Sequence, residues 1–146
     1  MKRLIAIILS VVSIVLVLAS CGKENITSAI IPQTDFIEIE VDTSEETGEL
    51  TYSDPVRIGD LDKINALLDI INGAQEYELD EFVTFECCPI VTFYLSDGSL
   101  LYLSAMDYKG IFYTCRQWNF SDKTMYRLPD DFKLATYIEA LYNENK

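Results

Sequence analysis

The sequence predicts an α+β protein in which two helices pack against an antiparallel meander sheet of about five to six strands. Three observations predict this class. Short apolar or alternating runs recur, two of them are joined by an Asp-Gly turn, and two segments carry apolar residues at helical spacing. The expected order along the chain is β-β-α-β-β-β-(β)-α, within a single domain.

The first strand is expected at residues 36–41, FIEIEV, where isoleucine and valine alternate with glutamate. This period of two is typical of a strand with one buried face. The acidic segment 42–49 then forms a turn, and residues 49–53, ELTYS, pair back as a second strand. The acidic segment fails the EF-hand template because its glycine and its final glutamate are out of position, so we expect no metal site there.

The first helix is expected within residues 53–73. Asp60 is a suitable N-cap, Asp62 lies favourably in the first turn, and Gly73 ends the helix. One apolar stripe supports the assignment: Leu61, Ile64, Leu67, Leu68 and Ile71.

The chain becomes β-like after a polar loop at 74–81. The expected strands share apolar and β-branched composition: FVTFE (82–86), IVTFYL (90–95), LLYLSA (100–105), IFYTC (111–115) and TMYRL (124–128). Asp97-Gly98 favours a two-residue hairpin that pairs Leu95 with Leu100 and Phe93 with Tyr102. Both faces of that hairpin are largely apolar, so we expect both to be covered.

A closing helix is expected at residues 129–145. Pro129 and the two aspartates after it mark its start. Its apolar stripe comprises Leu134, Ile138, Leu141 and Tyr142.

The residue inventory argues against catalysis. The chain contains no histidine, which removes the commonest general base and most zinc and copper sites. It also lacks the glycine-rich phosphate-binding motifs, the nucleophile elbow and the zinc-protease motif. We therefore expect no enzyme, no cofactor and no metal.

The aromatic residues suggest recognition. Nine of the seventeen aromatic residues lie between positions 91 and 126, and tyrosine and tryptophan suit binding surfaces because they combine apolar area with a polar tip. The candidate surface comprises Tyr94, Tyr102, Tyr113 and Trp118. Core packing is the alternative. The recognition hypothesis requires both helices to cover the same face of the sheet, so that the other face stays open.

The N-terminus resembles the signal peptide of bacterial lipoproteins. Lys2 and Arg3 precede a 16-residue apolar run that ends Leu18-Ala19-Ser20-Cys21-Gly22, a lipobox-like site. The resemblance implies cleavage before Cys21 and a diacylglyceryl anchor on that cysteine, which would hold the protein on the extracytoplasmic face of the cell membrane. The expected organisation is a signal peptide at 1–20, a lipidated N-terminus and flexible tether at 21–34, and one α+β domain at 35–146.

Cleavage would change the net charge of the chain and the number of its free cysteines. It would remove two cations and no acidic residue, so the net charge would move from −13 to −15 and nucleic acid would be an unlikely partner. It would also leave an odd set of cysteines: Cys87, Cys88 and Cys115. Two alternatives remain open for them, namely buried apolar packing or one disulfide from Cys115 to Cys87 or Cys88.

The segment from Asp54 to Tyr142 resembles small YhfM-like lipoproteins of Gram-positive bacteria. The shared features are the helix pattern around Asp60-Leu61, Asp97-Gly98 in a hairpin, and Tyr126-x-Leu128 before the last helix. The resemblance implies no particular activity. The sequence therefore predicts a membrane-anchored, non-catalytic binding module for a protein or envelope ligand. The alternative is a carrier of a small ligand or metal that works with a transport system.

Overall fold

The α+β prediction is confirmed by a computed structural model, which describes residues 29–44, 49–78, 88–117, 122–129 and 132–146. Seven strands form one antiparallel sheet in the order β2-β1-β4-β5-β6-β7-β3. The strands are β1 (Thr34–Glu40), β2 (Val56–Ile58), β3 (Gln75–Glu76), β4 (Ile90–Leu95), β5 (Leu100–Ala105), β6 (Ile111–Cys115) and β7 (Thr124–Arg127). The helices are α3 (Leu61–Asn72) and α4 (Leu134–Asn145).

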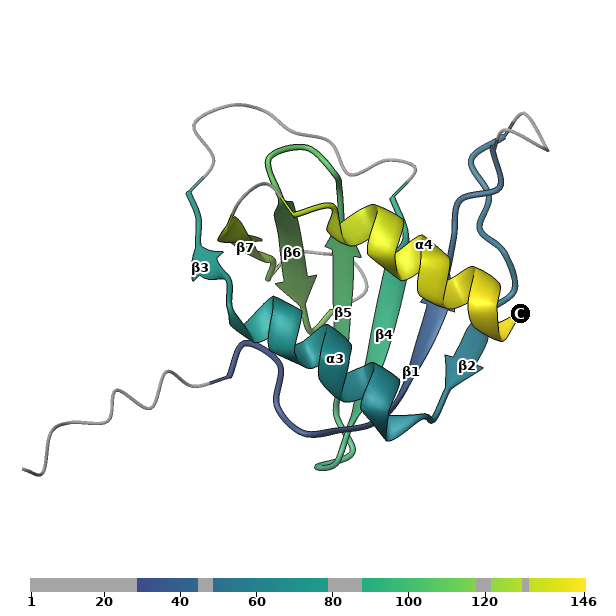
Figure 1. Ribbon diagram of the computed structural model, residues 1–146, viewed down its shortest axis with the longest axis horizontal. Helices are drawn as coiled ribbons and strands as arrows, with labels where there is room; N and C mark the ends of the chain where they lie inside the picture. Colours follow the sequence, from purple (N-terminus) through teal and green to yellow (C-terminus); the bar gives the residue numbers. More distant parts are fainter. Residues whose placement is uncertain (1–28, 45–48, 79–87, 118–121, 130–131) are drawn as a thin grey trace, which may run out of the picture.

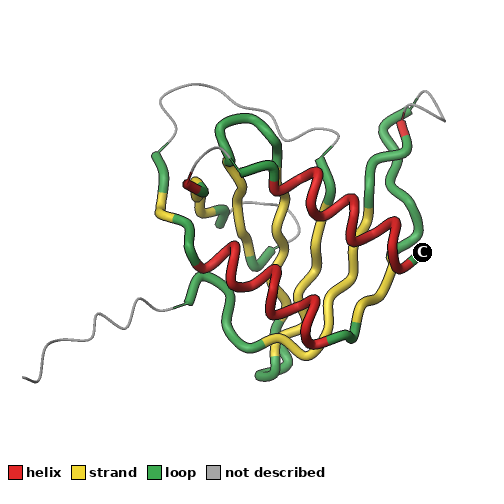
Figure 2. The backbone as a smooth tube through the Cα atoms, viewed as in Figure 1, coloured by secondary structure: helices red, strands yellow, loops and turns green. Residues whose placement is uncertain are grey.

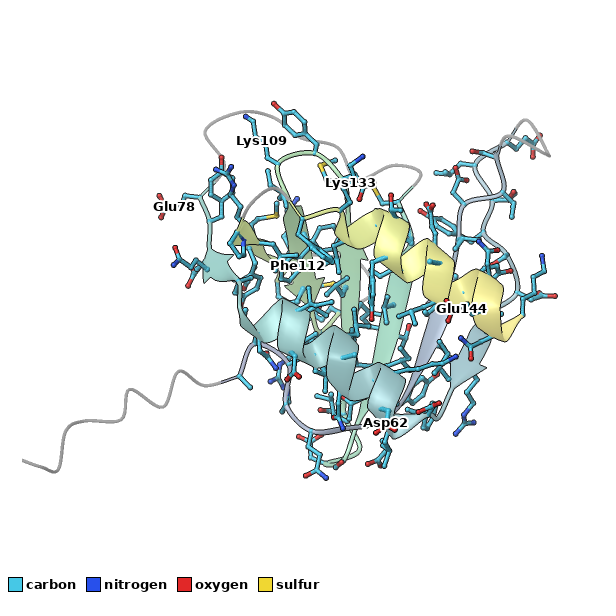
Figure 3. All side chains as sticks on the ribbon, viewed as in Figure 1. Asp62, Glu78, Lys109, Phe112, Lys133 and Glu144 are labelled. Carbon is cyan, nitrogen blue, oxygen red and sulfur yellow. The ribbon has the colours of Figure 1, made fainter. Side chains whose placement is uncertain are left out.

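Both helices lie on the same face of the sheet and run in opposite directions across it (Figures 1 and 2). One apolar core fills the space between the helices and the strands. It combines Ile37, Ile39, Val91, Phe93, Leu95, Leu101, Leu103 and Phe112 of the sheet with Ile64, Leu67, Ile71, Leu134, Ile138 and Leu141 of the helices. Phe112 lies in this core beneath the helix layer (Figure 3). The arrangement meets the condition that the recognition hypothesis requires.

The N-terminal strands differ from the prediction in one respect. Residues 51–53 do pair back, through an isolated bridge between Asp42 and Tyr52 and two backbone hydrogen bonds of 2.9 Å. The second strand proper is β2, which was expected to lead into the first helix. It pairs with the middle of β1, Ile37 opposite Ile58. Because β2 has only three residues and follows Pro55, its local pattern is too short to signal a strand.

The hairpin register predicted from Asp97-Gly98 is wrong by one residue. The observed pairs are Tyr94 with Leu100 and Phe93 with Leu101. The loop contains three residues, because the Leu95 amide bonds the Ser99 carbonyl at 3.0 Å and Gly98 takes the left-handed φ of 83°. A slip of one residue exchanges the faces. Phe93 and its apolar neighbours therefore share the core face, and the opposite face becomes mixed in polarity.

Helix α3 has the predicted caps. The Asp60 carboxylate accepts hydrogen bonds from the amides of Asp62 (3.0 Å) and Lys63 (3.4 Å), and the chain leaves the helix at Gly73. Four members of the predicted stripe are buried, whereas Leu61 is 58% exposed. Leu61 is the first residue of the helix.

Helix α4 begins later than predicted. It starts at Leu134 rather than at Pro129, and Lys133 at its N-cap gives no side-chain cap. The cap comes from Asp107 in the loop between β5 and β6, whose carboxylate accepts hydrogen bonds from the Thr136 amide at 3.2 Å and from the Thr136 hydroxyl. A cap from a distant loop has no local sequence signal, which explains the misplaced start.

The folded domain begins before residue 35, the predicted boundary. Ile31 is 1% exposed and belongs to the core. The Asn72 side chain at the end of α3 holds its backbone: the Ile31 amide donates to Asn72 Oδ1 at 3.0 Å, and Asn72 Nδ2 donates to the Ile31 carbonyl at 3.4 Å. The folded domain therefore includes Ile31. The predicted strand at 82–86 lies outside the described residues.

Candidate functional site

The sheet face opposite the helices is the candidate site, and we call it the back face. Alternation along β1 places Phe36, Glu38 and Glu40 on it, because Ile37 and Ile39 between them point into the core. The registers of the neighbouring strands place Tyr94 and Tyr102 on the same face. All five side chains are half-buried. Neither helix covers this side of the sheet (Figure 1).

An aromatic stack of Arg57, Phe36 and Tyr94 occupies the β2-β1-β4 part of the back face. The Phe36 and Tyr94 rings stack with centroids 4.1 Å apart and an interplanar angle of 18°. The Arg57 guanidinium carbon lies 3.4 Å from the Phe36 ring centroid, a cation–π contact. Three neighbouring strands thus build a flat layer with a charged end.

The Glu38 carboxylate binds the Tyr94 end of this stack. The Tyr94 hydroxyl donates a hydrogen bond to Glu38 Oε2 at 2.7 Å. This bond and partial burial raise the pKa of Tyr94 above its usual value, so Tyr94 stays a neutral donor at physiological pH. Glu38 and Tyr94 are 56 residues apart in the chain. Their contact depends on the pairing of β1 with β4.

Glu40 is the second carboxylate of the back face. Burial, followed by the charge of Glu38, raises the pKa of Glu40. Neither glutamate forms an ion pair with a described lysine or arginine. An ion pair of 3.8 Å joins Lys63 of α3 and Glu144 of α4. Glu144 is labelled in Figure 3 on the helix side of the molecule.

The part of the back face that lies over β6 is buried. Tyr113 is 6% exposed, Cys115 is 2% exposed and Ser104 is 1% exposed. Burial raises the pKa of Tyr113 to about 12. The Ser104 hydroxyl lies close enough to influence that pKa, yet it makes no hydrogen bond of normal geometry. This half of the face is therefore packing, and the accessible half lies over β1, β4 and β5.

The described cysteines are buried thiols. Burial and the nearby Asp122 raise the pKa of Cys115 to about 11, which leaves almost no thiolate at neutral pH. Neither Cys88 nor Cys115 is joined in a disulfide. A bridge between Cys88 and Cys115 is thus contradicted, while Cys87 lies outside the described residues.

Other features of the surface offer no defined chemistry. A surface pocket of about 380 Å³ lies beside β3 and β7, lined by Gln75, Glu76, Tyr77 and Arg127 among others. In the parts of the chain that the structure describes, no group of three His, Cys, Asp or Glu side chains could hold a metal ion. Within the same parts, no helix has the length and apolar character needed to cross a membrane.

Two of the four predicted recognition residues reach the accessible back face: Tyr94 and Tyr102. Tyr113 is also on that face but is buried, so its prediction as a contact residue is wrong. Trp118 lies outside the described residues. Phe36 and Arg57 were not predicted as site residues. The alternation of β1 could have placed Phe36 beside Glu38, but its stacking on Tyr94 depends on strand pairing across α3.

Comparison with known proteins gives no relative to define the class further. No family model, no curated protein and no solved structure matches this chain. The resemblance to YhfM-like lipoproteins therefore stays a prediction.

Proposed function

We propose that this protein is a non-catalytic recognition module that binds a protein or envelope ligand through the accessible part of its back face. The observation that carries the proposal is the packing of both helices on one side of the sheet, which leaves Phe36, Tyr94 and Tyr102 half-buried on the other. Stacked aromatic rings offer a rigid apolar surface that loses little conformational entropy on binding. Glu38 and Arg57 at the margins supply polar contacts that fix orientation.

The proposal includes an anchor at Cys21. The lipobox-like segment supports a diacylglyceryl group on this cysteine, and each buried CH₂ group contributes about 0.8 kcal/mol to membrane attachment. Two acyl chains hold a protein stably, whereas one chain gives marginal binding. The domain would then stand on the extracytoplasmic side, joined to the membrane by the residues between Cys21 and Ile31. Replacing Cys21 with alanine should release the protein from washed membranes, and full retention with unchanged processing would contradict the anchor.

A site-specific crosslinking experiment tests the recognition surface. A photoreactive amino acid at Tyr102 in cells that produce the protein should give a discrete adduct with one partner. The same amino acid at Asn65, an exposed position on α3, is the matched control. The partner identified by mass spectrometry should then bind the purified protein and lose affinity for Tyr94→Ala. Identical adducts from Tyr102 and Asn65 would contradict a recognition role for the back face.

A further inference from the structure

Glu38 and Glu40 form a pair of negative charges on the back face. They are two residues apart on β1 and point to the same side, which places their Cα atoms about 7 Å apart. Both side chains are half-buried. No described lysine or arginine forms an ion pair with either carboxylate.

The cross-strand neighbour of Glu38, Arg57, contacts an aromatic ring instead of the carboxylate. Arg57 is the direct cross-strand partner of Glu38, so a pair between them would be the simple expectation. Its guanidinium instead lies over the Phe36 ring at 3.4 Å. Glu38 receives a hydrogen bond from the neutral Tyr94 hydroxyl, which satisfies one oxygen without cancelling the charge. The fold therefore keeps both the aromatic stack and the two charges.

The two carboxylates repel each other, because like charges this close disfavour the ionised form. Burial and the charge of Glu38 raise the pKa of Glu40, so ionised Glu40 is costly in the unbound state. A cation placed between the two carboxylates would offset the repulsive part of this cost. The adjacent Phe36 and Tyr94 rings would receive the aliphatic stem that leads to a lysine or arginine head group.

We propose that the back face binds a lysine- or arginine-bearing segment of a partner protein, with a cationic head group between Glu38 and Glu40 and its stem against Tyr94. This proposal rests on the proposed function and specifies the chemistry of the partner. The strongly acidic chain, with its net charge of −13, would also attract a basic partner at long range.

A fluorescent octalysine peptide provides the probe. Its binding to the full chain in a non-ionic detergent should be measured by fluorescence anisotropy at low salt. The double variant Glu38→Gln/Glu40→Gln should raise the Kd about tenfold, which corresponds to about 1.4 kcal/mol. The charge-matched control Asp62→Asn/Asp69→Asn changes two exposed positions of α3, on the other side of the sheet, and should change the Kd by less than about twofold.

Each contrary result has a defined meaning. Equal loss in both double variants would show attraction by net charge alone and overturn the proposal, as would the absence of saturable binding below about 1 mM. Side-chain-acetylated octalysine that binds as tightly as octalysine, and loses affinity for Tyr94→Ala, would overturn the preference for cations but leave the recognition surface intact. The Glu→Gln double variant should fold at least as stably as the parent, because it removes repulsion, and a thermal melt checks this.

Discussion

Replacement of Gly98 with alanine should destabilise the β4–β5 hairpin through backbone strain alone. Gly98 has φ of +83°, and a Cβ at this position would meet no atom within 4 Å. Placing an L-residue in the left-handed region costs about 1–2 kcal/mol, whereas restricting the unfolded chain returns about 0.4–1 kcal/mol. The expected net effect is a fall of about 1 kcal/mol in the free energy of unfolding.

Gly59→Ala is the matched control. A Cβ on Gly59 also meets nothing within 4 Å, but Gly59 does not have a positive φ. The same change should therefore stabilise the protein by about 0.4–1 kcal/mol. Urea denaturation followed by circular dichroism should show opposite shifts in the midpoint with unchanged slopes. Equal stability of the two variants would refute the assignment of strain to Gly98.

Asp97→Gly separates the two turn geometries. A two-residue turn would need positive φ at both Asp97 and Gly98, so glycine at position 97 would stabilise it. In the structure Asp97 does not have a positive φ, and its carboxylate accepts hydrogen bonds from the Ser99 amide (2.9 Å) and hydroxyl (2.6 Å). These bonds lower the pKa of Asp97. Asp97→Gly should thus destabilise, with an effect that shrinks as the pH falls through the pKa of Asp97, and stabilisation would favour the two-residue turn.

Three further outcomes follow from named contacts. Asp107→Ala should lower the free energy of unfolding by about 1 kcal/mol, because α4 loses its cap. Asp107→Asn keeps an acceptor and should lower it less. Equal losses for the two variants in urea denaturation would contradict a cap. Burial raises the pKa of Tyr113 from 10 to about 12, so the folded state holds this proton more tightly than the unfolded chain. Stability should therefore fall as the pH rises from 10 to 12. Tyr113→Phe should flatten this part of the stability–pH curve, and an unchanged slope would refute Tyr113 as the source of the fall. The Cys115 thiol, with its pKa raised to about 11, should react with a disulfide reagent at pH 8 far more slowly in the native protein than in urea. In urea, the domain without Cys21 should titrate three thiols, and fewer than three would indicate a bridge.

Local sequence signals were sufficient where the structural cause is local. Asp60 caps α3 through amides two and three residues away, so its role can be read directly from spacing. The alternation in β1 likewise placed Glu38 and Glu40 on the face away from the core. By contrast, the start of α4 depends on Asp107, 29 residues away from Thr136, and no local pattern around Pro129 reports that contact.

The candidate site shows the same division. The enrichment of aromatic residues included Tyr94 and Tyr102, which lie on the accessible part of the back face, and also Tyr113, which is buried. Tyr113 lies on the same face as Tyr102, and composition cannot say which part of that face is buried in the folded protein. Phe36 and Arg57 were missed because their contacts cross from β2 to β1 and from β1 to β4.

The sequence by itself determined the elements of this protein: helix α3 between its caps, the stripe of α4, the main strands and the excess of acidic charge. Only the tertiary structure decided that β1 pairs with β4, that the hairpin loop has three residues, and that both helices share one face. The physical reason is that each amphipathic element can bury its apolar side on more than one surface. The choice among those surfaces is made only when all the elements pack together, and that choice leaves the aromatic stack and the two glutamates on the back face.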